Sequence, residues 1–600
     1  MVSCFYYGDY MTAATNYEPF HNPMAMQIWD MKYRLKEQDG TPIDLTVYDT
    51  WRRVAKSLAA VEKDPEYWEP VFYDVLQSFG FVPAGRINAG AGANRNVTLF
   101  NCFVMGTIPD SLSGIMDALK EAALTMQAGG GIGYDFSTLR PQDAPVKGVA
   151  ATASGPLTFM DVWDAMCRTI MSAGVRRGAM MATMRVDHPD IFKFIDAKRD
   201  SARLRMFNLS VLATDEFMQA VKDNAQFDLR FGGKVYRTVS ARGLWDHIMQ
   251  ATYAYAEPGV IFIDRINQNN NLSYCETIAA TNPCGEQPLP PYGACLLGSI
   301  NLAAMLNDDF TINKEKLKRH VSIAVRMMDN VVDASRFPLP AQEKEAKGKR
   351  RIGLGVTGLA DALALGGITY GSDDAIAWVD DVMSFIAEVA YIASVELAKE
   401  KGAFPLFDAD KYLATGNMQK MPQYVRDEIR KYGIRNALLT SIAPTGTISL
   451  YAGNVSSGIE PIFALEYDRK VLQKDGSKVT ETVVDYAVDK WRRANPGKSL
   501  QSSFVTAQTL MPIDHVRMQA AAQKWIDSSI SKTINCPEDI SFDDFKDVYL
   551  AAWDMGCKGC TTYRPNDVTG SVLEVKKEES SGSCELRVDP ETGQLIRSCE

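Results

Sequence analysis

One segment of the chain combines side chains that could carry out redox and acid–base chemistry. Residues 281–302 read TNPCGEQPLPPYGACLLGSINL and contain two thiols, Cys284 and Cys295, with the carboxylate of Glu286 close to the first. A proline and a glycine flank Cys284, and such residues favour an exposed turn over an enclosed strand. A typical buried cysteine is an inert small hydrophobe. This sequence instead predicts a thiol that is presented to another molecule.

A second segment could bind phosphate. The sequence APTGTIS, residues 443–449, follows the apolar run NALLTSI and offers hydroxyl and backbone N–H groups. If a helix begins here, its N-terminus favours an anion, which suits a di- or triphosphate. An ordinary Ser/Thr-rich turn after a strand is the alternative. The dinucleotide-binding motif G-x-G-x-x-G is not complete at Gly131 and Gly133, because Phe136 stands where the third glycine is required. The P-loop motif G-x-x-x-x-G-K-[ST] does not occur in the sequence.

The remaining thiols suggest neither a disulfide framework nor a metal site. Eleven cysteines are scattered through a long chain without a secretory signal. Cys4, Cys167, Cys275 and Cys536 are predicted to be inert and buried. The C-x-x-C at 557–560 could be half a zinc site, but a second pair at matching spacing is missing, and the five histidines form no metal-ligand motif. We therefore predict no bound metal.

Composition sets the broad class of the protein. The chain has 600 residues, 46% of them hydrophobic and 23% charged, which permits a large core of several layers or domains. Its net charge of −10 argues against direct nucleic-acid binding, so any phosphate site must be local. No apolar run is long enough to span a bilayer and no signal peptide is visible. We predict a cytoplasmic protein without membrane contact.

Three regions can be distinguished along the sequence. Residues 1–95 hold short helical patterns such as DTWRRVAKSLAAVEK. Up to about residue 566, β-rich runs (VTLFNCFVM, FNLSVLA, GVIFIDRIN, ACLLGSINL, NALLTSIAP) alternate with amphipathic helices, as in parallel βα units. The longest predicted helix is 373–401, with Ser372 as N-cap and Gly402 after its end. From about residue 567 the sequence is polar and rich in Ser and Gly, which predicts a mobile tail.

Four longer segments resemble the catalytic subunit of ribonucleotide reductase, in particular its adenosylcobalamin-dependent class II type. They are NPCGEQPLPPYGACLLGSINL, RIGLGVTGLADAL, APTGTISLYAGNVSSGIEP and GCKGCTTYRPN, and the resemblance extends from about residue 80 to 566. It implies an α/β fold: a ten-stranded α/β barrel with a central finger loop, preceded by a helical N-terminal region. The expected domains are 1–95 (helical region), 96–566 (barrel) and 567–600 (Cys-containing tail).

The resemblance implies a catalytic role for each of five residues. Cys284 would be the thiyl radical that removes the ribose 3′ hydrogen, at the finger tip, where solvent cannot quench it. Glu286 would act as general base on the 3′-hydroxyl, and Asn282 would orient the substrate. Cys102 and Cys295 would supply two electrons and close to a disulfide. That closure requires Cα atoms about 4.4 to 6.8 Å apart.

The resemblance also implies how substrate and reductant are bound. Asn101 would contact the substrate, and its phosphates would lie on Ala443, Pro444, Thr445, Gly446, Thr447 and Ile448. The tail thiols Cys584 and Cys599 would re-reduce the disulfide and pass its oxidation on to a thioredoxin- or glutaredoxin-like protein. The closely spaced tail pair usual in the family is absent here.

Regulation and assembly follow from the same resemblance. The Met-rich segments 110–128 and 156–174 resemble the family's dimer-forming helices, with ordinary core as the alternative. A deoxynucleotide effector would bind near Asp110, Ser111, Leu112 and Arg140. The loop 197–205 resembles the segment that relays effector identity, and a homodimer is expected. The family's N-terminal ATP-binding cone has no counterpart in this sequence, so overall control by ATP or dATP is not expected.

The source of the radical distinguishes the classes within the family. Class I subunits receive it from a separate metal subunit through two adjacent tyrosines, whereas CTTYRPN contains Tyr563 alone. This favours adenosylcobalamin as the cofactor. A class I-type subunit is one alternative, and a catalytically silent nucleotide-binding or zinc-holding protein of the same fold is another. The sequence leaves open whether the substrate is a diphosphate or a triphosphate.

Overall fold

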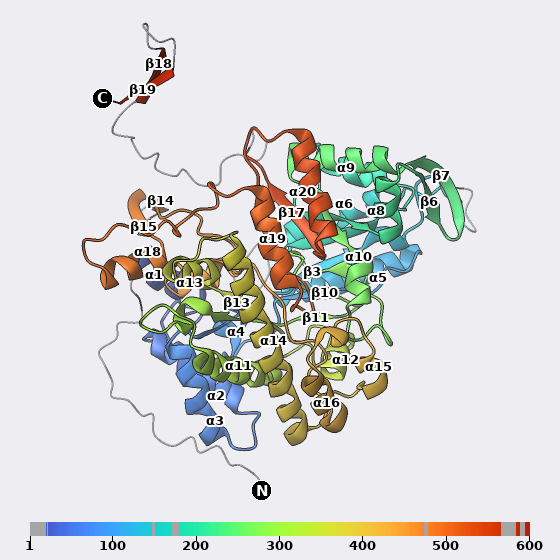
Figure 1. Ribbon diagram of the computed structural model, residues 1–600. Helices are drawn as coiled ribbons and strands as arrows, with labels where there is room; N and C mark the ends of the chain where they lie inside the picture. Colours follow the sequence, from blue (N-terminus) through green and yellow to red (C-terminus); the bar gives the residue numbers. More distant parts are fainter. Residues whose placement is uncertain are drawn as a thin grey trace.

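The computed structural model (Figure 1) describes most of the chain. It covers residues 20, 22–146, 151–170, 179–200, 202–472, 478–565, 584–588 and 595–599. Only the backbone is described for 468–472, 478–481, 584–588 and 595–599. Cys4, Ser201 of the 197–205 loop and residues 171–174 of the second Met-rich segment lie outside the described residues.

Helices open the described chain, as predicted. They are α1 (Pro23–Lys32), α2 (Val47–Ala59) and α3 (Pro65–Gln77), drawn in blue in Figure 1. Each begins at a side-chain cap, because Asn22, Thr46 and Asp64 accept hydrogen bonds from backbone N–H groups in the first turn. Trp51 and Phe72 from their apolar faces are buried in the main core. The N-terminal helical region is therefore confirmed.

The larger sheet has eight strands in the order β11-β2-β3-β4-β5-β8-β17-β16. The strands from β2 to β8 run parallel, whereas β17 pairs antiparallel with β8 and β11 pairs antiparallel with β2. Parallel neighbours require crossover connections, which the intervening helices supply. The strands are β2 (Cys102–Val104), β3 (Gly131–Asp135), β4 (Met180–Arg185), β5 (Phe207–Ala213), β8 (Gly259–Phe262), β11 (Ala294–Cys295), β16 (Thr533–Asn535) and β17 (Gly559–Tyr563).

A second sheet contains three strands, β1 (Phe81–Pro83), β12 (Leu297–Asn301) and β13 (Gly353–Thr357). Only Leu296 separates β12 from β11 of the larger sheet. Isolated parallel bridges continue beyond β13, from Leu354 to Thr440 and from Ile442 to Ile530. The predicted strand in NALLTSIAP is thus present only as bridge partners. The fold is mixed α/β, as expected.

The segment between the sheets forms the finger loop, residues 280–289. Its two short strands, β9 (Ala280–Thr281) and β10 (Pro288–Leu289), pair antiparallel with each other. A Cβ atom at Gly133 of β3 would collide with the carbonyl oxygen of Thr281, so only glycine lets the loop pass this close to the sheet. The sheet and the loop are therefore in direct contact.

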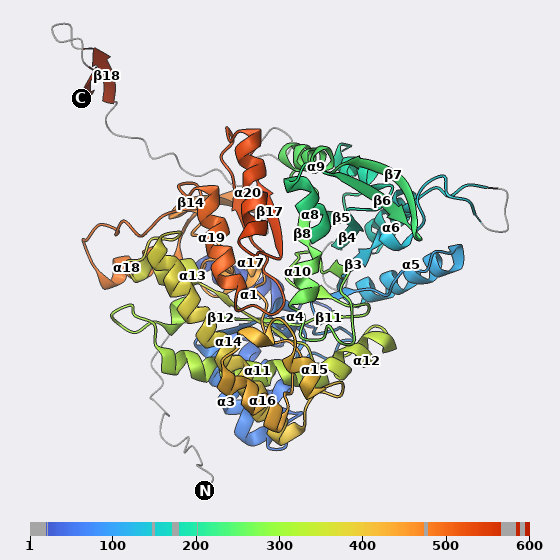
Figure 2. The same cartoon turned by 45° about the vertical axis from the view of Figure 1, so that its right-hand side comes forward.

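Helices cover the sheets on the outside (Figures 1 and 2). The longest, α14 (Asp373–Lys401), begins at Ser372 and ends before Gly402, as predicted. The others are α4 (Gly85–Gly90), α5 (Leu112–Gln127), α6 (Pro156–Thr169), α7 (Ile191–Ile195), α8 (Asp215–Lys222), α9 (Ala241–Tyr255), α10 (Ile263–Gln268), α11 (Lys314–Ala334), α12 (Pro340–Lys349), α13 (Leu359–Leu365), α15 (Ala409–Leu413), α16 (Gln423–Tyr432), α17 (Gly446–Tyr451), α18 (Tyr486–Ala494), α19 (Pro512–Gln523) and α20 (Phe542–Asp554).

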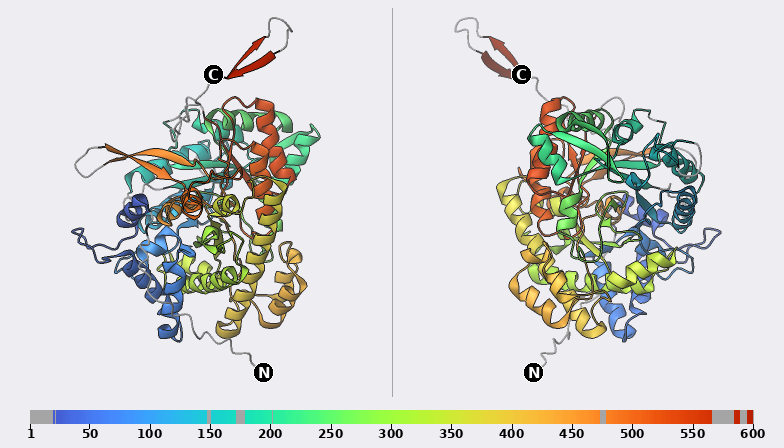
Figure 3. Two further views of the ribbon diagram at one scale, coloured as in Figure 1. Left: turned by 60° about the vertical axis from the view of Figure 1, so that its left-hand side comes forward. Right: turned by 90° about the vertical axis from the view of Figure 1, so that its right-hand side faces the viewer.

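Three two-stranded hairpins complete the described structure. They are β6 (Gln226–Phe231) with β7 (Lys234–Ser240), β14 (Glu466–Leu472) with β15 (Lys478–Val484), and β18 (Cys584–Val588) with β19 (Leu595–Cys599). The β14–β15 hairpin projects from the body of the molecule (Figure 3). Within the described ranges, every helix is too short or too polar to cross a lipid bilayer.

Candidate active site

The finger loop carries Cys284 at a tight turn. Gly285 has φ of 83°, a left-handed conformation that favours glycine, and its N–H donates to the Asn282 carbonyl at 3.1 Å. Asn208 of β5 donates from Nδ2 to the Pro283 carbonyl at 2.8 Å. On the other side, the carbonyl of Glu286 accepts from the Ser441 hydroxyl at 2.8 Å. The loop is therefore held between the larger sheet and the segment that precedes α17.

The thiol of Cys284 is accessible although its neighbours are not. Asn282 and Glu286 are 0% and 2% exposed, whereas Cys284 is exposed. A Cβ atom at Gly285 would meet nothing within 4 Å, so open space lies beside the thiol. The expectation that the finger position alone shields Cys284 from solvent is therefore wrong. The fold leaves this thiol open to approach, and exclusion of water must come from the molecules that bind there.

Two buried amide atoms near the thiol lack hydrogen-bond partners among the described residues. Asn282 Oδ1 accepts from the Gln287 N–H at 2.9 Å, which leaves Asn282 Nδ2 buried and unpaired. Asn101 Oδ1 is also buried and has no hydrogen-bond partner among the described residues. An unsatisfied buried polar group costs about 1–3 kcal/mol, and it is an exception that needs an explanation. Hydrogen bonds to a bound ligand would satisfy both atoms.

Cys102 and Cys295 face each other across two antiparallel strands. They are direct partners in the register of β2 and β11, and both are free thiols. Directly opposed residues in antiparallel pairs have Cα atoms about 4.5 to 5.5 Å apart, within the range that a disulfide requires. Two residues distant in sequence are thus placed where they can close and open a disulfide.

The electrostatics of Cys295 show that all the reactive groups lie close together. Burial raises the pKa of this thiol well above its usual value, and Cys102, Glu286 and Cys284 raise it further. Cys295 therefore remains a protonated thiol at neutral pH. The surrounding apolar cluster consists of Ala84, Val104, Ala280, Leu289, Leu297 and Ala443. Because Ala443 begins the predicted phosphate loop, this cluster also joins that loop to the thiol pair.

The predicted phosphate loop runs into the start of α17. Gly446 and Thr447 are exposed, and a Cβ atom at Gly446 would meet nothing within 4 Å. The first N–H groups of a helix have no partner within the helix, so those of residues 446–448 can bind an anion. Ala443, Thr445 and Ile448 are buried and Pro444 is half-buried, and they support the loop from below.

Two of the three hydroxyl groups of this loop, those of Thr445 and Ser449, are engaged within the protein. Thr445 Oγ1 accepts from the Gly458 N–H at 2.7 Å and lies 2.9 Å from Ser449 Oγ. Thr357 Oγ1 joins them, 2.8 Å from Ser449 Oγ and 3.2 Å from Thr445 Oγ1. The expectation that Thr445 and Ser449 offer hydroxyl groups to a phosphate is therefore corrected. These two side chains hold the loop, and its backbone and the exposed side chain of Thr447 remain for the ligand.

The predicted effector residues also lie together. Arg140 donates from Nε to Asp110 Oδ2 at 2.9 Å and from Nη2 to the Asp110 carbonyl at 3.0 Å. Ser111 caps α5, and Leu112, the first residue of that helix, is 67% exposed. The two helices of the Met-rich segments, α5 and α6, are only partly buried, so the alternative of ordinary core does not describe them fully.

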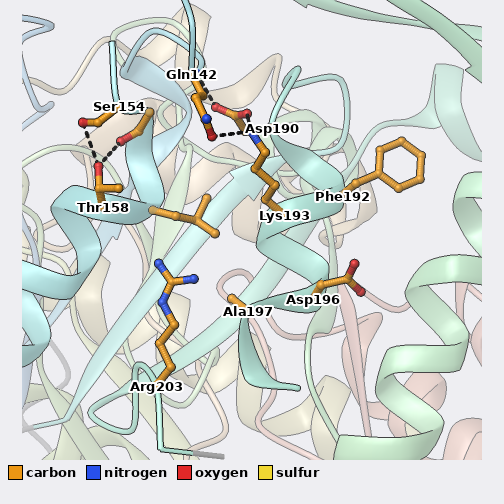
Figure 4. Close-up of a pocket in the computed structure, with 11 residues that line it drawn as sticks. Gln142, Ser154, Thr158, Asp190, Phe192, Lys193, Asp196, Ala197 and Arg203 are labelled. Atoms are coloured by element: carbon orange, nitrogen blue, oxygen red, sulfur yellow. Dashed lines mark hydrogen bonds and ion pairs between the residues drawn. The ribbon is translucent and has the colours of Figure 1, made fainter. Parts of the chain in front are cut away.

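A pocket of about 370 Å³ lies between the start of α6 and the 197–205 loop (Figure 4), and Asp110, Ser111, Leu112 and Arg140 do not line it. Gln142 lines it on one side, and Ala197 and Arg203 of the loop line it on the other. Arg203 also donates to both carboxylate oxygens of Asp161 on α6, at 3.0 and 2.8 Å. The loop is thus tied to a helix through Arg203, while Arg199, Asp200, Ala202 and Arg205 are exposed, as the alternative of a solvated turn expects.

The other thiols divide into buried and exposed ones. Cys167 and Cys536 are buried, as predicted, but Cys275 is exposed because it lies in an irregular segment between α10 and the finger loop. In the C-x-x-C, burial raises the pKa of Cys557 to about 12 and that of Cys560 well above its usual value. Such thiols are poor metal ligands. Among the described residues, no group of three His, Cys, Asp or Glu side chains could hold a metal ion.

The backbone of the tail brings its two cysteines into register. Cys584 at the start of β18 and Cys599 at the end of β19 are direct partners in the antiparallel pair. A hairpin can therefore replace the close sequence spacing that this tail lacks.

Two supporting residues escaped the sequence analysis. Asn208 interrupts the apolar strand FNLSVLA, and a polar residue inside such a strand could have indicated a special contact. Ser441 lies just before the phosphate loop, and nothing in its sequence context points to the Glu286 carbonyl.

Comparison with family models gives two matches. The model described as "Ribonucleotide reductase, barrel domain" matches residues 100–563. The model described as "Ribonucleotide reductase, all-alpha domain" matches residues 19–96.

Individual relatives are similar along most of the chain. A protein of Mycobacterium tuberculosis (strain CDC 1551 / Oshkosh), named "Vitamin B12-dependent ribonucleoside-diphosphate reductase", is 38% identical over 92% of this chain and 80% of its own length. A protein of the same name from Thermoplasma acidophilum is 38% identical over 86% of this chain and 68% of its own length. A Chlamydia pneumoniae protein, "Ribonucleoside-diphosphate reductase subunit alpha", is 28% identical over 90% of this chain and 58% of its own length.

Proposed function

Because the chain belongs to the ribonucleotide reductase family, we propose that it is a class II catalytic subunit that reduces ribonucleotides to 2′-deoxyribonucleotides for DNA synthesis. One observation carries the proposal: Cys102 and Cys295 are paired in register beside the loop of Cys284 and Glu286. A catalytically silent protein of this fold would have no need of such an arrangement.

Adenosylcobalamin is the radical source. The two most similar relatives described above are named B12-dependent, and Tyr563 is followed by an arginine rather than a second tyrosine, which disfavours the class I alternative. The exposed thiol of Cys284 and the open space beside Gly285 fit a large cofactor, and these two residues would face it. When bound, adenosylcobalamin supplies an unpaired electron through its cobalt–carbon bond.

The residues of the finger loop then act on the ribose. The Cys284 sulfur, as a radical, removes the 3′ hydrogen, and the Glu286 carboxylate takes the proton of the 3′-hydroxyl. Asn282 Nδ2, held in place by the bond that its Oδ1 accepts, donates to a substrate hydroxyl. Asn101 Oδ1 accepts from another. The 2′-hydroxyl leaves as water while Cys102 and Cys295 give up two electrons and two protons and form a disulfide. Cys284 then returns the hydrogen atom to C3′, and Glu286 returns the proton to the 3′ oxygen.

The disulfide step gives a direct prediction. One turnover without a reductant should leave Cys102 and Cys295 joined by a disulfide, because their register allows closure without backbone movement. Peptide mass spectrometry after an anaerobic single-turnover reaction would detect the cross-link. Cys102→Ser and Cys295→Ser should each prevent it and abolish dithiol-supported turnover. If turnover links Cys295 to another cysteine, the assignment of the pair is wrong.

The substrate's phosphates are proposed to bind residues 443–448, through the N–H groups at the start of α17. The exposure of Gly446 and Thr447 and the open space at Gly446 support this placement. The names of the relatives favour a diphosphate, with a triphosphate as the alternative.

A closed ten-stranded barrel is proposed for residues 96–566, between a helical region at 1–95 and a Cys-containing tail at 567–600. The continuity of β11 with β12, the antiparallel pairing of β17 with β8, and the bridges at Leu354 and Ile442 support a closed ring. The family matches to 19–96 and 100–563 support the division into domains. An experimental structure with an open edge between β16 and the segment at 442 would contradict closure.

Effector binding and dimer formation are proposed for the region of α5 and α6. The ion pair of Arg140 with Asp110 and the cap at Ser111 place polar groups beside apolar side chains that remain exposed. The exposed fractions of these side chains are 67% for Leu112, 42% for Met116 and Leu124, and 38% for Val162. A homodimer held by this face would bury them. Sedimentation that shows only a monomer in the presence of deoxynucleotides would contradict the proposal.

Re-reduction is assigned to the tail. The register of Cys584 with Cys599 supports a dithiol that takes the oxidation from Cys102 and Cys295 and delivers it to a thioredoxin- or glutaredoxin-like protein. A cytoplasmic location is proposed because that compartment keeps thiols reduced. Replacement of both tail cysteines by serine should stop turnover supported by such a protein and spare turnover supported by dithiothreitol.

A reconstitution assay tests the proposed function. The purified chain, supplied anaerobically with adenosylcobalamin and dithiothreitol, should convert CDP or CTP to the deoxynucleotide without another subunit. The ratio of the two rates identifies the substrate class. Activity that appears only after addition of a separate metal-containing subunit would establish the class I alternative.

A further inference from the structure

Two carboxyl groups are buried against each other near the phosphate loop. Asp361, in the first turn of α13, is 0% exposed, and Asp485, the N-cap of α18, is 4% exposed. Their side chains lie within hydrogen-bonding reach of each other. Two ionised carboxylates only accept hydrogen bonds, so this contact requires a proton between them.

The other oxygen of each carboxyl group is fixed by backbone N–H groups. Asp361 Oδ2 accepts from the Ser456 N–H at 2.7 Å. Asp485 Oδ1 accepts from the N–H groups of Ala487 and Val488 at 2.9 and 3.3 Å. Asp361 Oδ1 is buried and has no conventional donor among the described residues, which leaves it for the shared proton. The pair thus joins α13, α18 and the segment around Ser456.

The segment around Ser456 is in turn bonded to the phosphate loop. The Ser456 carbonyl accepts from Thr357 Oγ1 at 2.8 Å and from the Gly358 N–H at 2.7 Å. Thr357 belongs to the hydroxyl cluster that contains Thr445, and Gly458, two residues beyond Ser456, donates directly to Thr445 Oγ1. A displacement of Ser456 would therefore move the residue that precedes the first turn of α17.

We propose that Asp361 and Asp485, sharing a proton, are positioning residues that hold the phosphate loop in its nucleotide-binding conformation, and that loss of this proton weakens nucleotide binding. The inference rests on the proposed binding of substrate phosphates by residues 443–448. The two carboxyl groups touch neither the ribose nor the phosphates. Through them, the affinity for nucleotide depends on pH.

Burial sets the direction of this dependence. It raises the pKa of Asp361 to about 6 and that of Asp485 well above its usual value. The charged side chain that faces the pair is Lys490 of α18, and Lys316, Arg493 and Asp308 in turn face Lys490. Lys490 favours the ionised form of Asp361 but does not cancel the effect of burial.

The sign for stability follows from proton counting. Above about pH 4, where an aspartate of the unfolded chain has lost its proton, the folded pair still holds more protons than the unfolded chain does. Stability should therefore fall as pH rises through about 6, until the folded pair has lost its protons too. Nucleotide affinity should fall in the same direction, because two negative charges then repel each other beside Ser456.

Asp361→Asn separates this role from a general structural one. The asparagine can accept from the Ser456 N–H through its oxygen and donate to Asp485 through its nitrogen, so the contact persists without a titrating proton. Affinity for CDP would be measured by calorimetry on the full chain between pH 6.5 and 9. The unmodified protein should lose up to about tenfold in affinity per pH unit above the pKa of the pair. Asp361→Asn should bind with a flat pH profile, and Asp361→Ala should bind weakly throughout.

Asp489→Asn, which removes a carboxylate from the same helix outside the pair, is the matched control and should keep the pH dependence of the unmodified protein. Equal pH profiles for the unmodified protein and Asp361→Asn would overturn the inference. A pH-independent affinity of the unmodified protein would do the same. Absence of CDP and CTP binding at every pH would instead contradict the proposed substrate site, so the two failures are distinguishable.

Discussion

Replacement of Cys284 by serine is expected to abolish nucleotide reduction. A serine hydroxyl cannot form the sulfur radical that removes the 3′ hydrogen, and no other thiol stands at the turn of the finger loop. The side chain is exposed and differs from serine by one atom, so the fold should not change. Activity with adenosylcobalamin and dithiothreitol should fall below detection, a loss of at least about 10⁴-fold, as for removal of other essential reacting groups. CDP affinity should stay within about twofold.

Cys275→Ser is the matched control for this experiment. Cys275 is also exposed and precedes the same loop, but it lies outside the group formed by Cys284, Cys102 and Cys295. This variant should retain full activity. Measurable turnover by Cys284→Ser would show that another group attacks the ribose, and loss of activity in both variants would point to damage of the loop instead.

Replacement of Glu286 by glutamine should cause the second largest loss. The amide keeps the shape of the side chain but cannot take the proton of the 3′-hydroxyl, and general base catalysis contributes about 10²- to 10⁴-fold. We expect kcat to fall by that factor, with little change in KM. The backbone carbonyl of Glu286 still accepts from Ser441 and Ser529, so the loop should keep its position. Steady-state kinetics at saturating cofactor would measure the effect.

Two further variants sharpen the interpretation of this result. Glu286→Asp keeps a carboxylate on a side chain that is shorter by one methylene. Its kcat should lie between those of the unmodified protein and Glu286→Gln. Glu388→Gln removes an acidic group on α14 that accepts from the Tyr424 hydroxyl at the surface, and it should have no comparable effect on kcat. If Glu286→Gln raises KM and leaves kcat unchanged, Glu286 binds substrate and does not act as the base.

Much of the local structure could be read from the sequence. The helix 373–401 was predicted with both of its ends, because Ser372 and Gly402 are strong local signals that need no distant partner. The βα alternation predicted the parallel strands, but the predicted strand in NALLTSIAP forms only isolated bridges. Periodicity does not show how many hydrogen bonds a neighbouring strand supplies.

The candidate site was predicted less evenly. The finger loop was found because Cys, Glu, Pro and Gly occur together in a short segment, and the phosphate loop because Thr, Ser and Gly follow an apolar run. Contacts between distant segments could not be found in this way. The bond from Asn208 to the finger loop, the engagement of Thr445 by Gly458 and the exposure of Cys284 all depend on which segments the fold brings together.

The sequence alone determined the reactive groups: a thiol and a carboxylate on one loop, a Ser/Thr-rich turn after an apolar run, and a thiol one strand further on. It did so because each lies within a few residues of its own structural signal. Only the tertiary structure decided that Asn208 holds the finger loop, that Gly133 lets the loop pass, and that Asp361 meets Asp485. Those placements depend on burial and strand register between segments far apart in the chain, and local sequence does not encode them.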